Sequence, residues 1–361
     1  MPVYKDKEKE TWFCKFYYVD WTGCKKQKKK EGFKRKKDAL EFERSFIELH
    51  SSDCNVKFKN LVKLYLNDCK TRQRPTSYNT KYLVIEKHIL PYFEEMPINQ
   101  IDIKTIRLWQ NNIMSLDKEH SANYLRLING YLSSIFNYAV KYYNLKSNPV
   151  KECGKICSKS SSNVDYWTID EFKKFMEVNK CVQRKFLPQY VAVQIMFWTG
   201  IRVGELLALT LSDFDFENHT LSINKSYTRF KGNDLIQLPK TEKSNRTISI
   251  PKFLEDIIHS YTNTIYGYNP KERLFMINRS AINYFIKTGC LKSGVKKIRV
   301  HDLRHSHASL LINMGVSPLL IQERLGHEDI QTTLGTYSHL YSTEHVQLAD
   351  KLQKTFKNST F

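Results

Sequence analysis

The spacing of hydrophobic positions changes along the chain and divides it into regions of different predicted structure. In the first region, residues 11–18 are aromatic-rich and alternate between apolar and polar positions, which is typical of a strand. Residues 20–23 carry turn-forming side chains, and residues 36–49 repeat apolar positions at helical spacing. We therefore expect a module with a small sheet and one helix over residues 1–52.

The second region has helical periodicity. From Phe58 to Tyr65 the apolar side chains follow the i, i+3, i+4, i+7 pattern of one helix face, and a longer stripe of this kind covers residues 125–139. The segment that follows is rich in Lys, Ser, Cys and Gly and has no apolar periodicity. The pattern predicts a helical domain over residues 53–150 and a linker over residues 151–164.

The third region, residues 165–361, combines helical and strand patterns. Thr168, with Glu171 three positions later, forms a capping box that predicts a helix start. Three short β-type segments interrupt the helices, at residues 221–224, 235–238 and 246–250. After them, residues 342–356 have the pattern of a tail helix, which could pack on its own domain or on a neighbouring subunit. We expect a multidomain protein, mainly α with small β-sheets, whose last domain is mixed α/β.

The charge of the chain indicates the kind of partner that it binds. The 361 residues include 57 Lys and Arg against 37 Asp and Glu, a formal net charge of +20 with a pI near 9.4. Such a surplus favours a polyanion such as DNA. Nine basic residues cluster in the first module beside its aromatic residues and are the expected DNA contacts there: Lys25, Lys26, Lys28, Lys29, Lys30, Lys34, Arg35, Lys36 and Lys37. The alternative is a solvated basic surface.

Membrane and secretory roles find no support in the sequence. The most apolar run, residues 190–198, is much shorter than the ~20 residues that a membrane span needs. The N-terminus has no apolar signal segment, and the eight Cys form no CxxC pair. Cys153 and Cys157 are close together, but no His-rich segment accompanies them, so reduced thiols are a better interpretation than a zinc site. We expect a cytoplasmic protein.

Candidate chemistry begins with the segment TGIRVGELLAL at residues 199–209. The glycines on both sides of Arg202 allow a tight turn and a close backbone approach at a helix start. Glu205 follows Arg202 by three positions and can orient its guanidinium. Taken alone, this is an Arg–Glu pair on a helix, and a structural ion pair is the favoured interpretation.

A second segment, HDLRHSHAS at residues 301–309, places His301 and Arg304 on one side of a predicted helix. Asp302 can cap that helix, and Leu310, Leu311 and Met314 are expected on its buried face. A metal site is disfavoured, because His305 and His307 are two residues apart and diverge on a helix, and because HxxR lacks the carboxylate of a zincin motif.

Two more motifs lie near the C-terminus. LGH at residues 325–327 ends a helix that Ser317 and Pro318 begin. TLGTYSHL, which contains Tyr337, follows at residues 333–340. With 21 Tyr in the chain, a single Tyr carries no weight except through the residues that accompany it.

Together these residues suit phosphoryl transfer to a side chain. Two Arg can neutralise the charge that gathers on the oxygens of a phosphodiester under attack, and His donors can complete the clamp. A Tyr phenol becomes a nucleophile where cations and a base favour loss of its proton. Lys240, between the β-type segments 235–238 and 246–250, is a candidate acid if those segments form a hairpin, with Lys243 as the alternative.

The four motifs, in this order and near the C-terminus, resemble those of the tyrosine recombinase (phage integrase) family. The resemblance covers residues 165–345 strongly. The helical middle resembles the family's core-site-binding domain. The N-terminal module resembles the arm-binding module in integrases of phages and conjugative transposons, which implies a three-stranded sheet and one helix over residues 1–52. No departure from the motifs is visible, so the resemblance implies an active enzyme.

Each motif position then takes a role from the resemblance. Arg202 and Arg304 would clamp the scissile phosphate, and Glu205 would brace Arg202. His301 would contact the phosphate and handle the proton of the nucleophile. His327 would donate a hydrogen bond to the phosphate. Lys240 would be the general acid, and Tyr337 would form a 3′-phosphotyrosine.

The resemblance also implies partners. These are double-stranded DNA with core and arm attachment sites, a homotetramer on that DNA, and possible assistance from an excisionase and a DNA-bending protein, with no metal or other cofactor. The implied function is integration and excision of a mobile element in a bacterial host, near the nucleoid. The alternatives are a type IB topoisomerase-like enzyme and a DNA-binding regulator that does not cut.

Overall fold

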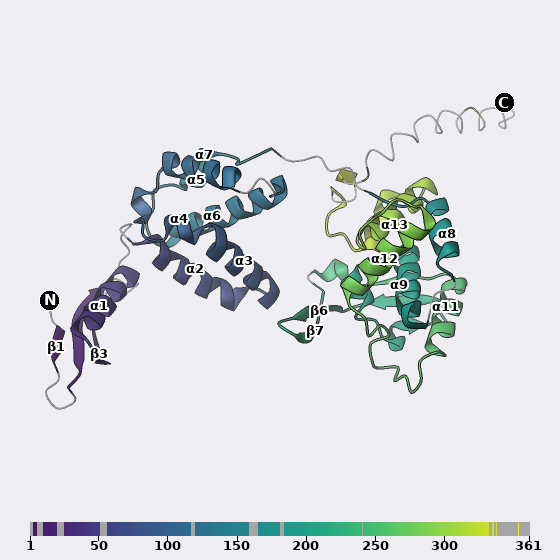
Figure 1. Ribbon diagram of the computed structural model, residues 1–361, viewed down its shortest axis with the longest axis horizontal. Coiled ribbons are helices and arrows are strands. Elements are labelled where there is room, and N and C mark those ends of the chain that lie inside the picture. The colour runs from purple at the N-terminus through teal and green to yellow at the C-terminus, as the bar shows by residue number, and fades with distance from the viewer. Residues whose placement is uncertain are drawn as a thin grey trace, which may run out of the picture. The chain divides into compact units, whose positions relative to one another are not determined.

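The computed structural model describes residues 3–5, 10–19, 25–50, 56–116, 120–158, 165–180, 184–239, 241–331, 334–335, 337 and 353. The chain forms two compact units, residues 1–161 and 162–361 (Figure 1). Helices predominate and the sheets are small and antiparallel, so the predicted fold class is confirmed. Among the described residues, no helix combines the length and the apolar character that crossing a membrane requires.

The N-terminal module consists of an antiparallel sheet and helix α1 (Lys36–His50). The strands β1 (Val3–Lys5), β2 (Trp12–Val19) and β3 (Lys25–Phe33) lie in the order β1-β2-β3. Cys14 and Phe16 of β2 are buried together with Ala39 of α1, because alternate strand residues point to the same face. The predicted strand and helix are confirmed, and the predicted turn at residues 20–23 lies outside the described residues.

The described residues of the next part of the first unit form the helices α2 (Phe58–Arg72), α3 (Pro75–His88), α4 (Leu90–Phe93), α5 (Ile103–Leu116), α6 (Ala122–Tyr142) and α7 (Pro149–Cys153). Their buried faces form one core, which includes the predicted stripe of α6. Cys153 and Ile156 belong to this core although they fall in the predicted linker. The beginning of the predicted linker is therefore packed, at least as far as Ile156. The sequence pattern did not reveal this packing, because the single turn of α7 is too short to show apolar periodicity.

The second unit is built around helix α9 (Leu187–Thr199), which is apolar on nearly all sides and buried. The helices α8 (Ile169–Val178), α11 (Lys252–Thr262), α12 (Arg279–Ser293) and α13 (Asp302–Asn313) surround it, as Figure 1 shows. Thr168 and Glu171 make the predicted capping box of α8, with hydrogen bonds of 3.3 and 2.8 Å. Two further helices, α10 (Val203–Leu206) and α14 (Pro318–Leu325), carry the motif residues described below.

The strands of this unit pair differently from the prediction. β4 (Phe214–Asp215), β5 (Thr220–Ile223) and β8 (Arg246–Ser249) form one sheet, whereas β7 (Asn233–Gln237) pairs with β6 (Ser226–Phe230). The expected hairpin between residues 235–238 and 246–250 was wrong. Lys231 and Gly232 both have positive φ, 51° and 86°, which is the backbone of a two-residue hairpin turn, and that turn joins β7 to the preceding strand.

Candidate active site

The site begins at the turn between α9 and α10. Gly200 ends α9 with φ 68°, and Arg202 begins α10. A Cβ atom on Gly200 would lie 2.6 Å from the ring of His307, so only Gly fits the left-handed turn at this close approach. Gly204 permits a second close approach, because its Cβ would lie 2.6 Å from Oγ of Ser226 on β6. The predicted need for both glycines is confirmed.

Arg202 is held in place by three hydrogen bonds. Its backbone N–H and Nη1 donate to the carboxylate of Glu205 at 2.9 and 2.8 Å, as the spacing predicted. Its Nη2 donates to the carbonyl of Gly326 at 3.2 Å, at the end of α14. The segment 200–205 is therefore fixed against the LGH motif, which is more than a hundred residues away in the sequence.

A third Arg, which the motifs did not reveal, shares the same carboxylate. Nη2 of Arg246 donates to Glu205 at 3.0 Å, and its Nε donates to the carbonyl of Arg324 at 2.8 Å. Burial favours a raised pKa of Glu205, but Arg246 and then Arg202 lower it below its ordinary value. The sequence holds a signal for Arg246, because it alternates with buried Ile248 on its strand and with buried Ile250 directly after the strand.

Arg304 lies at the centre of the site and is 2% exposed. Its Nη1 donates to the carbonyl of Gly200 at 2.9 Å and its Nη2 to the carbonyl of Leu325 at 2.6 Å. Burial and the nearby Arg202 lower the pKa of Arg304 below its ordinary value, but a guanidinium keeps its charge at neutral pH. Arg304 therefore brings the turn before α10 and the end of α14 to one place.

His301 and His327 belong to the same cationic cluster. Burial, followed by Arg304, lowers the pKa of His301. Burial, followed by Arg304 and Arg202, lowers the pKa of His327 to about 3. At neutral pH both imidazoles are uncharged and can donate a hydrogen bond from one ring nitrogen.

The phenol of Tyr337 reaches this cluster. Tyr337 is 2% exposed and packs against Ala308, Ile312 and Leu325. Burial raises the pKa of the phenol above its ordinary value. The positive charge of Arg304 is close enough to lower this pKa and offset part of the effect. The phenol oxygen lies 2.6 Å from Nδ1 of His305.

Helix α13 differs from the prediction in two respects. His301 occupies the N-cap, while the carboxylate of Asp302 in the first turn binds the backbone N–H and the guanidinium of Arg299. Met314 is 68% exposed, so its predicted burial was wrong. The buried face carries polar groups that bind one another and nearby carbonyls, and an apolar pattern cannot reveal such a face.

His305 and His307 do diverge. Nδ1 of His307 is 2.8 Å from the carbonyl of Phe197, and its Nε2 accepts a hydrogen bond from Arg324 at 3.0 Å. This pairing fixes a neutral, fully buried imidazole with its proton on Nδ1. His307 and Arg324 are structural partners that sequence reasoning did not identify.

The two candidate acids, Lys240 and Lys243, follow strand β7. Lys240 lies outside the described residues, and the neighbouring strand β7 ends at Gln237. The alternative, Lys243, is exposed, and its Nζ donates to the carbonyl of Glu328 at 2.9 Å. Lys243 is therefore engaged beside the loop that carries His327.

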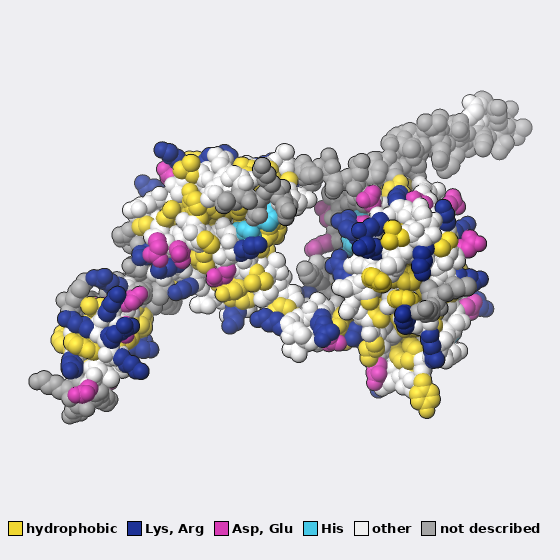
Figure 2. Space-filling view, viewed as in Figure 1, with side chains coloured by type: hydrophobic (Ala, Val, Ile, Leu, Met, Phe, Trp, Pro, Cys, Tyr) yellow, Lys and Arg dark blue, Asp and Glu magenta, His cyan; other side chains and the backbone are white. Residues whose placement is uncertain are grey.

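The basic residues of the N-terminal module divide into two groups. Lys28 and Lys30 extend over the rings of Phe46 and Phe42, on the side of helix α1. The opposite face of the sheet carries Phe13, Lys15 and Tyr17 of β2, and Lys29 of β3 lies opposite Lys15. Figure 2 shows Lys and Arg interleaved with hydrophobic side chains over this module.

The other predicted DNA contacts of this module differ in whether an acidic neighbour pairs with them. Lys26, Lys34, Lys36 and Lys37 are exposed, whereas the side chain of Lys25 lies outside the described residues. Arg35 forms an ion pair with Asp38 at 3.1 Å, and Lys29 forms one with Glu31. Acidic neighbours therefore reduce the charge that these two offer to DNA.

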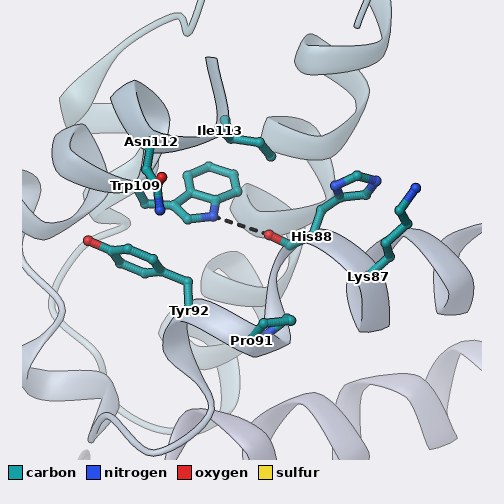
Figure 3. A pocket seen from close by; sticks show the side chains of 7 residues that line it. All are labelled: Lys87, His88, Pro91, Tyr92, Trp109, Asn112 and Ile113. Carbon is teal, nitrogen blue, oxygen red and sulfur yellow. Dashed lines mark hydrogen bonds between the residues drawn. The ribbon is translucent and has the colours of Figure 1, made fainter. Parts of the chain in front are cut away.

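A pocket and two thiols lie in the helical part of the first unit. In the helical part of the first unit, a pocket is lined by Lys87, His88, Pro91, Tyr92, Trp109, Asn112 and Ile113 (Figure 3). Nε1 of Trp109 donates to the carbonyl of His88 at 3.2 Å there. The thiols of Cys153 and Cys157 point to different partners, Gln110 and Ala122. Among the described residues, no three His, Cys, Asp or Glu are placed to hold a metal ion.

Comparison with known proteins identifies the chain. Residues 166–344 match the phage integrase family, residues 57–114 its N-terminal SAM-like domain, and residues 2–48 an arm DNA-binding domain. The ICEBs1 integrase of Bacillus subtilis is 32% identical over 339 residues, which cover 88% of this chain and 89% of that protein.

Solved structures have the same fold. The integrase of transposon Tn1549, in complex with a circular intermediate DNA, has a TM-score of 0.67 at 18% identity and covers 80% of this chain and 99% of its own. The lambda integrase, as a tetramer bound to a Holliday junction, has a TM-score of 0.57 at 18% identity and covers 91% of this chain and 96% of its own. The chain belongs to the phage integrase family of tyrosine recombinases and is a site-specific, DNA-binding recombinase.

Proposed function

We propose that this recombinase cuts DNA with Tyr337 and uses Arg202, Arg304, His301 and His327 to hold the scissile phosphate. The observation that carries the proposal is the convergence of these groups. The single side chain of Arg304 donates hydrogen bonds to the carbonyls of Gly200 and Leu325. These two bonds connect the turn that carries Arg202 to the motif that carries His327. Four separated segments therefore meet at one cluster of cationic and imidazole groups, and the phenol lies 2.6 Å from one of its imidazoles, that of His305.

The chemistry of this cluster suits a phosphodiester. Arg202 and Arg304 supply charge that stabilises the pentavalent transition state through hydrogen bonds. His301 and His327, neutral at pH 7, donate hydrogen bonds to its oxygens. Glu205 holds Arg202 and Arg246 in place through hydrogen bonds from both guanidiniums. Lys240 supplies the proton of the leaving 5′ oxygen, and the phosphotyrosine stores the bond energy for religation.

The biological reaction is integration and excision of a mobile element. The relative in Bacillus subtilis carries the name of an integrase and aligns over 88% of this chain, which supports this role. We further propose a homotetramer on two DNA sites, since recombination exchanges four strands and the lambda integrase forms a tetramer on a Holliday junction. An excisionase and a DNA-bending protein are proposed accessory partners.

The N-terminal module binds distal arm sites through the sheet face that carries Phe13, Lys15 and Tyr17. Tyr17 is 58% exposed, and Lys15 lies between two aromatic residues on that face. Cations that neutralise phosphates and rings that contact bases or sugars are both available there. The helical domain, in turn, binds the core site.

A nicked suicide substrate that carries the core site tests the function. The wild-type protein forms a covalent adduct visible on a denaturing gel, and Tyr337→Phe binds the DNA with equal affinity but forms none. Tyr284→Phe, at an exposed Tyr on α12, serves as the control and keeps full activity.

Two outcomes would support a different function. A wild-type protein that binds the site without any adduct would be a regulator. Efficient relaxation of supercoiled plasmids that lack the site would indicate a topoisomerase. An adduct in Tyr337→Phe would show that another residue is the nucleophile.

A further inference from the structure

His305 makes the closest polar contact that the structure shows for the nucleophile. Its Nδ1 lies 2.6 Å from the phenol oxygen of Tyr337, and the two ring centroids are 5.7 Å apart at an angle of 61°. His305 follows Arg304 directly on α13, and the resemblance to the family gave it no role. This contact joins a reacting atom to a side chain that can take up a proton.

We propose that His305 is the catalytic residue that accepts the phenol proton when Tyr337 attacks the scissile phosphate. The inference rests on the proposed function of Tyr337. It assigns proton transfer to His305 and leaves to His301 the contact with the phosphate oxygens.

The step balances as follows. The bond from the Tyr337 oxygen to phosphorus forms while the bond from phosphorus to the 5′ oxygen breaks. The phenol proton moves to Nδ1 of His305, which becomes an imidazolium, and the leaving 5′ oxygen takes a proton from Lys240. In religation, the attacking 5′ hydroxyl returns its proton to Lys240, and the imidazolium returns a proton to Tyr337.

The surroundings of His305 keep its ring uncharged before DNA binds. The pKa of His305 is lowered to about 4, first by burial, then by His301, and also by Arg304 and Arg299. The carboxylate of Asp302 raises this pKa and offsets part of the effect. The carboxylate of Asp302 is bound to Arg299 at 2.8 Å. His327 also lies close enough for the two imidazoles to influence each other. At neutral pH, an imidazole with this pKa has a nitrogen free of a proton.

The same groups explain how His305 can become a stronger base in the complex. A phosphate bound between Arg202 and Arg304 brings negative charge beside the cluster and offsets the cations that lower the pKa of His305. The edge-on contact of the His301 and His305 rings, with centroids 5.2 Å apart, keeps His305 facing Tyr337. Proton transfer is therefore favoured when the substrate is in place.

Two substitutions separate proton transfer from positioning. In His305→Asn, the amide oxygen can accept a hydrogen bond from the phenol but cannot take its proton. In His305→Ala, both capacities are lost. Single-turnover adduct formation is measured on the nicked core-site duplex from pH 6 to 9, with DNA affinity and melting temperature measured in parallel. His259→Asn, at an exposed His on α11, is the matched control.

We expect both His305 variants to form the adduct about 10²–10⁴-fold more slowly at pH 7 with unchanged DNA affinity. The rate of His305→Asn should rise steadily with pH as hydroxide takes over proton removal, whereas the wild-type rate levels off above the pKa of its base. His259→Asn should match the wild type.

Each contrary result overturns the inference in its own way. A fully active Asn variant beside a slow Ala variant would show that His305 only positions Tyr337. Full or increased activity in both would show that the contact restrains the nucleophile in the absence of DNA. If the Ala variant does not fold, the Asn variant decides the question alone. Absence of an adduct in the wild type would instead refute the proposed function.

Discussion

Arg246 and Glu205 form a buried ion pair with an Nη2 to Oε2 distance of 3.0 Å, although 41 residues separate them in the sequence. The side chains of Arg246 and Glu205 are 7% and 5% exposed. Because the same carboxylate also binds Arg202, a residue outside the recognised motifs controls the orientation of a predicted phosphate ligand. The active site therefore depends on a strand, β8, that contributes no motif.

Removing the charge of Glu205 should weaken both folding and cleavage. In Glu205→Gln, Arg246 keeps a buried charge without its anion, which costs about 3 kcal/mol in the free energy of unfolding. Urea denaturation at pH 7.5 measures this loss, and adduct formation should slow as Arg202 loses its support. Glu217→Gln, at an exposed acid of the same unit, should change neither quantity. Equal stability of the two variants would show that Glu205 does not stabilise this cluster.

Gly200 should tolerate no side chain. Ala at this position combines left-handed backbone strain with a Cβ atom 2.6 Å from the ring of His307 and 2.8 Å from Leu325. Together these effects should lower the free energy of unfolding by about 2–5 kcal/mol. Gly232→Ala is the control, because Gly232 also has positive φ but has open space around it, and it should cost about 1–2 kcal/mol. Equal losses in a urea titration would mean that the contact with His307 relaxes without cost.

The stability of the second unit should fall in mild acid. The pKa of buried His307 is about 3, whereas an unfolded His has a pKa of about 6.5. Below about pH 6.5 the unfolded chain therefore binds a proton that folded His307 rejects, and stability is lost as the pH falls from about 6.5 toward 3. The loss approaches about 1.4 kcal/mol per pH unit for this residue, and His301, His305 and His327 act in the same direction. Urea midpoints at pH 7.5, 6.5 and 5.5 check this, and a midpoint independent of pH would contradict it.

Lys240→Ala should cleave slowly and recover on a modified substrate. A sulfur atom in place of the leaving 5′ oxygen departs as a thiolate, which needs little help from an acid. Adduct formation on the two substrates measures the effect. Lys243→Ala is the matched comparison, since Lys243 is engaged with the carbonyl of Glu328. Rescue of the Lys243 variant rather than the Lys240 variant would move the acid to Lys243.

The N-terminal module should act on arm sites alone. Deleting residues 1–50 should weaken binding to distal arm sites and leave core-site cleavage intact. Lys15→Ala should lower arm-site affinity and reduce the salt dependence, the slope of log K against log[salt], by about one. Lys28→Ala tests the other side of the module, because that ammonium extends over Phe46, and it should affect arm binding less. Equal loss of arm and core activity on deletion would show that the module is structural.

The sequence determined the parts of this protein that depend on local spacing. The period of apolar residues predicted the helix α1 and the stripe of α6, and the three-residue spacing of Thr168 and Glu171 predicted the capping box of α8. Neighbouring residues on one helix face meet wherever the helix lies. Motif order and spacing were also enough to identify Arg202, Glu205, His301, Arg304, His327 and Tyr337 as candidates, since each motif is a short local segment.

Only the tertiary structure decided which distant groups share a partner. The pairing of β7 with β6, the ion pair of Arg246 with Glu205 and the contact of His305 with Tyr337 all join residues through space. Such contacts depend on how the packing of helices and strands brings polar groups together in the interior. A buried polar group without a hydrogen-bond partner costs free energy, so the groups that meet there bind one another. A one-dimensional pattern records that a polar residue lies on a buried face, but it does not record what that residue meets there.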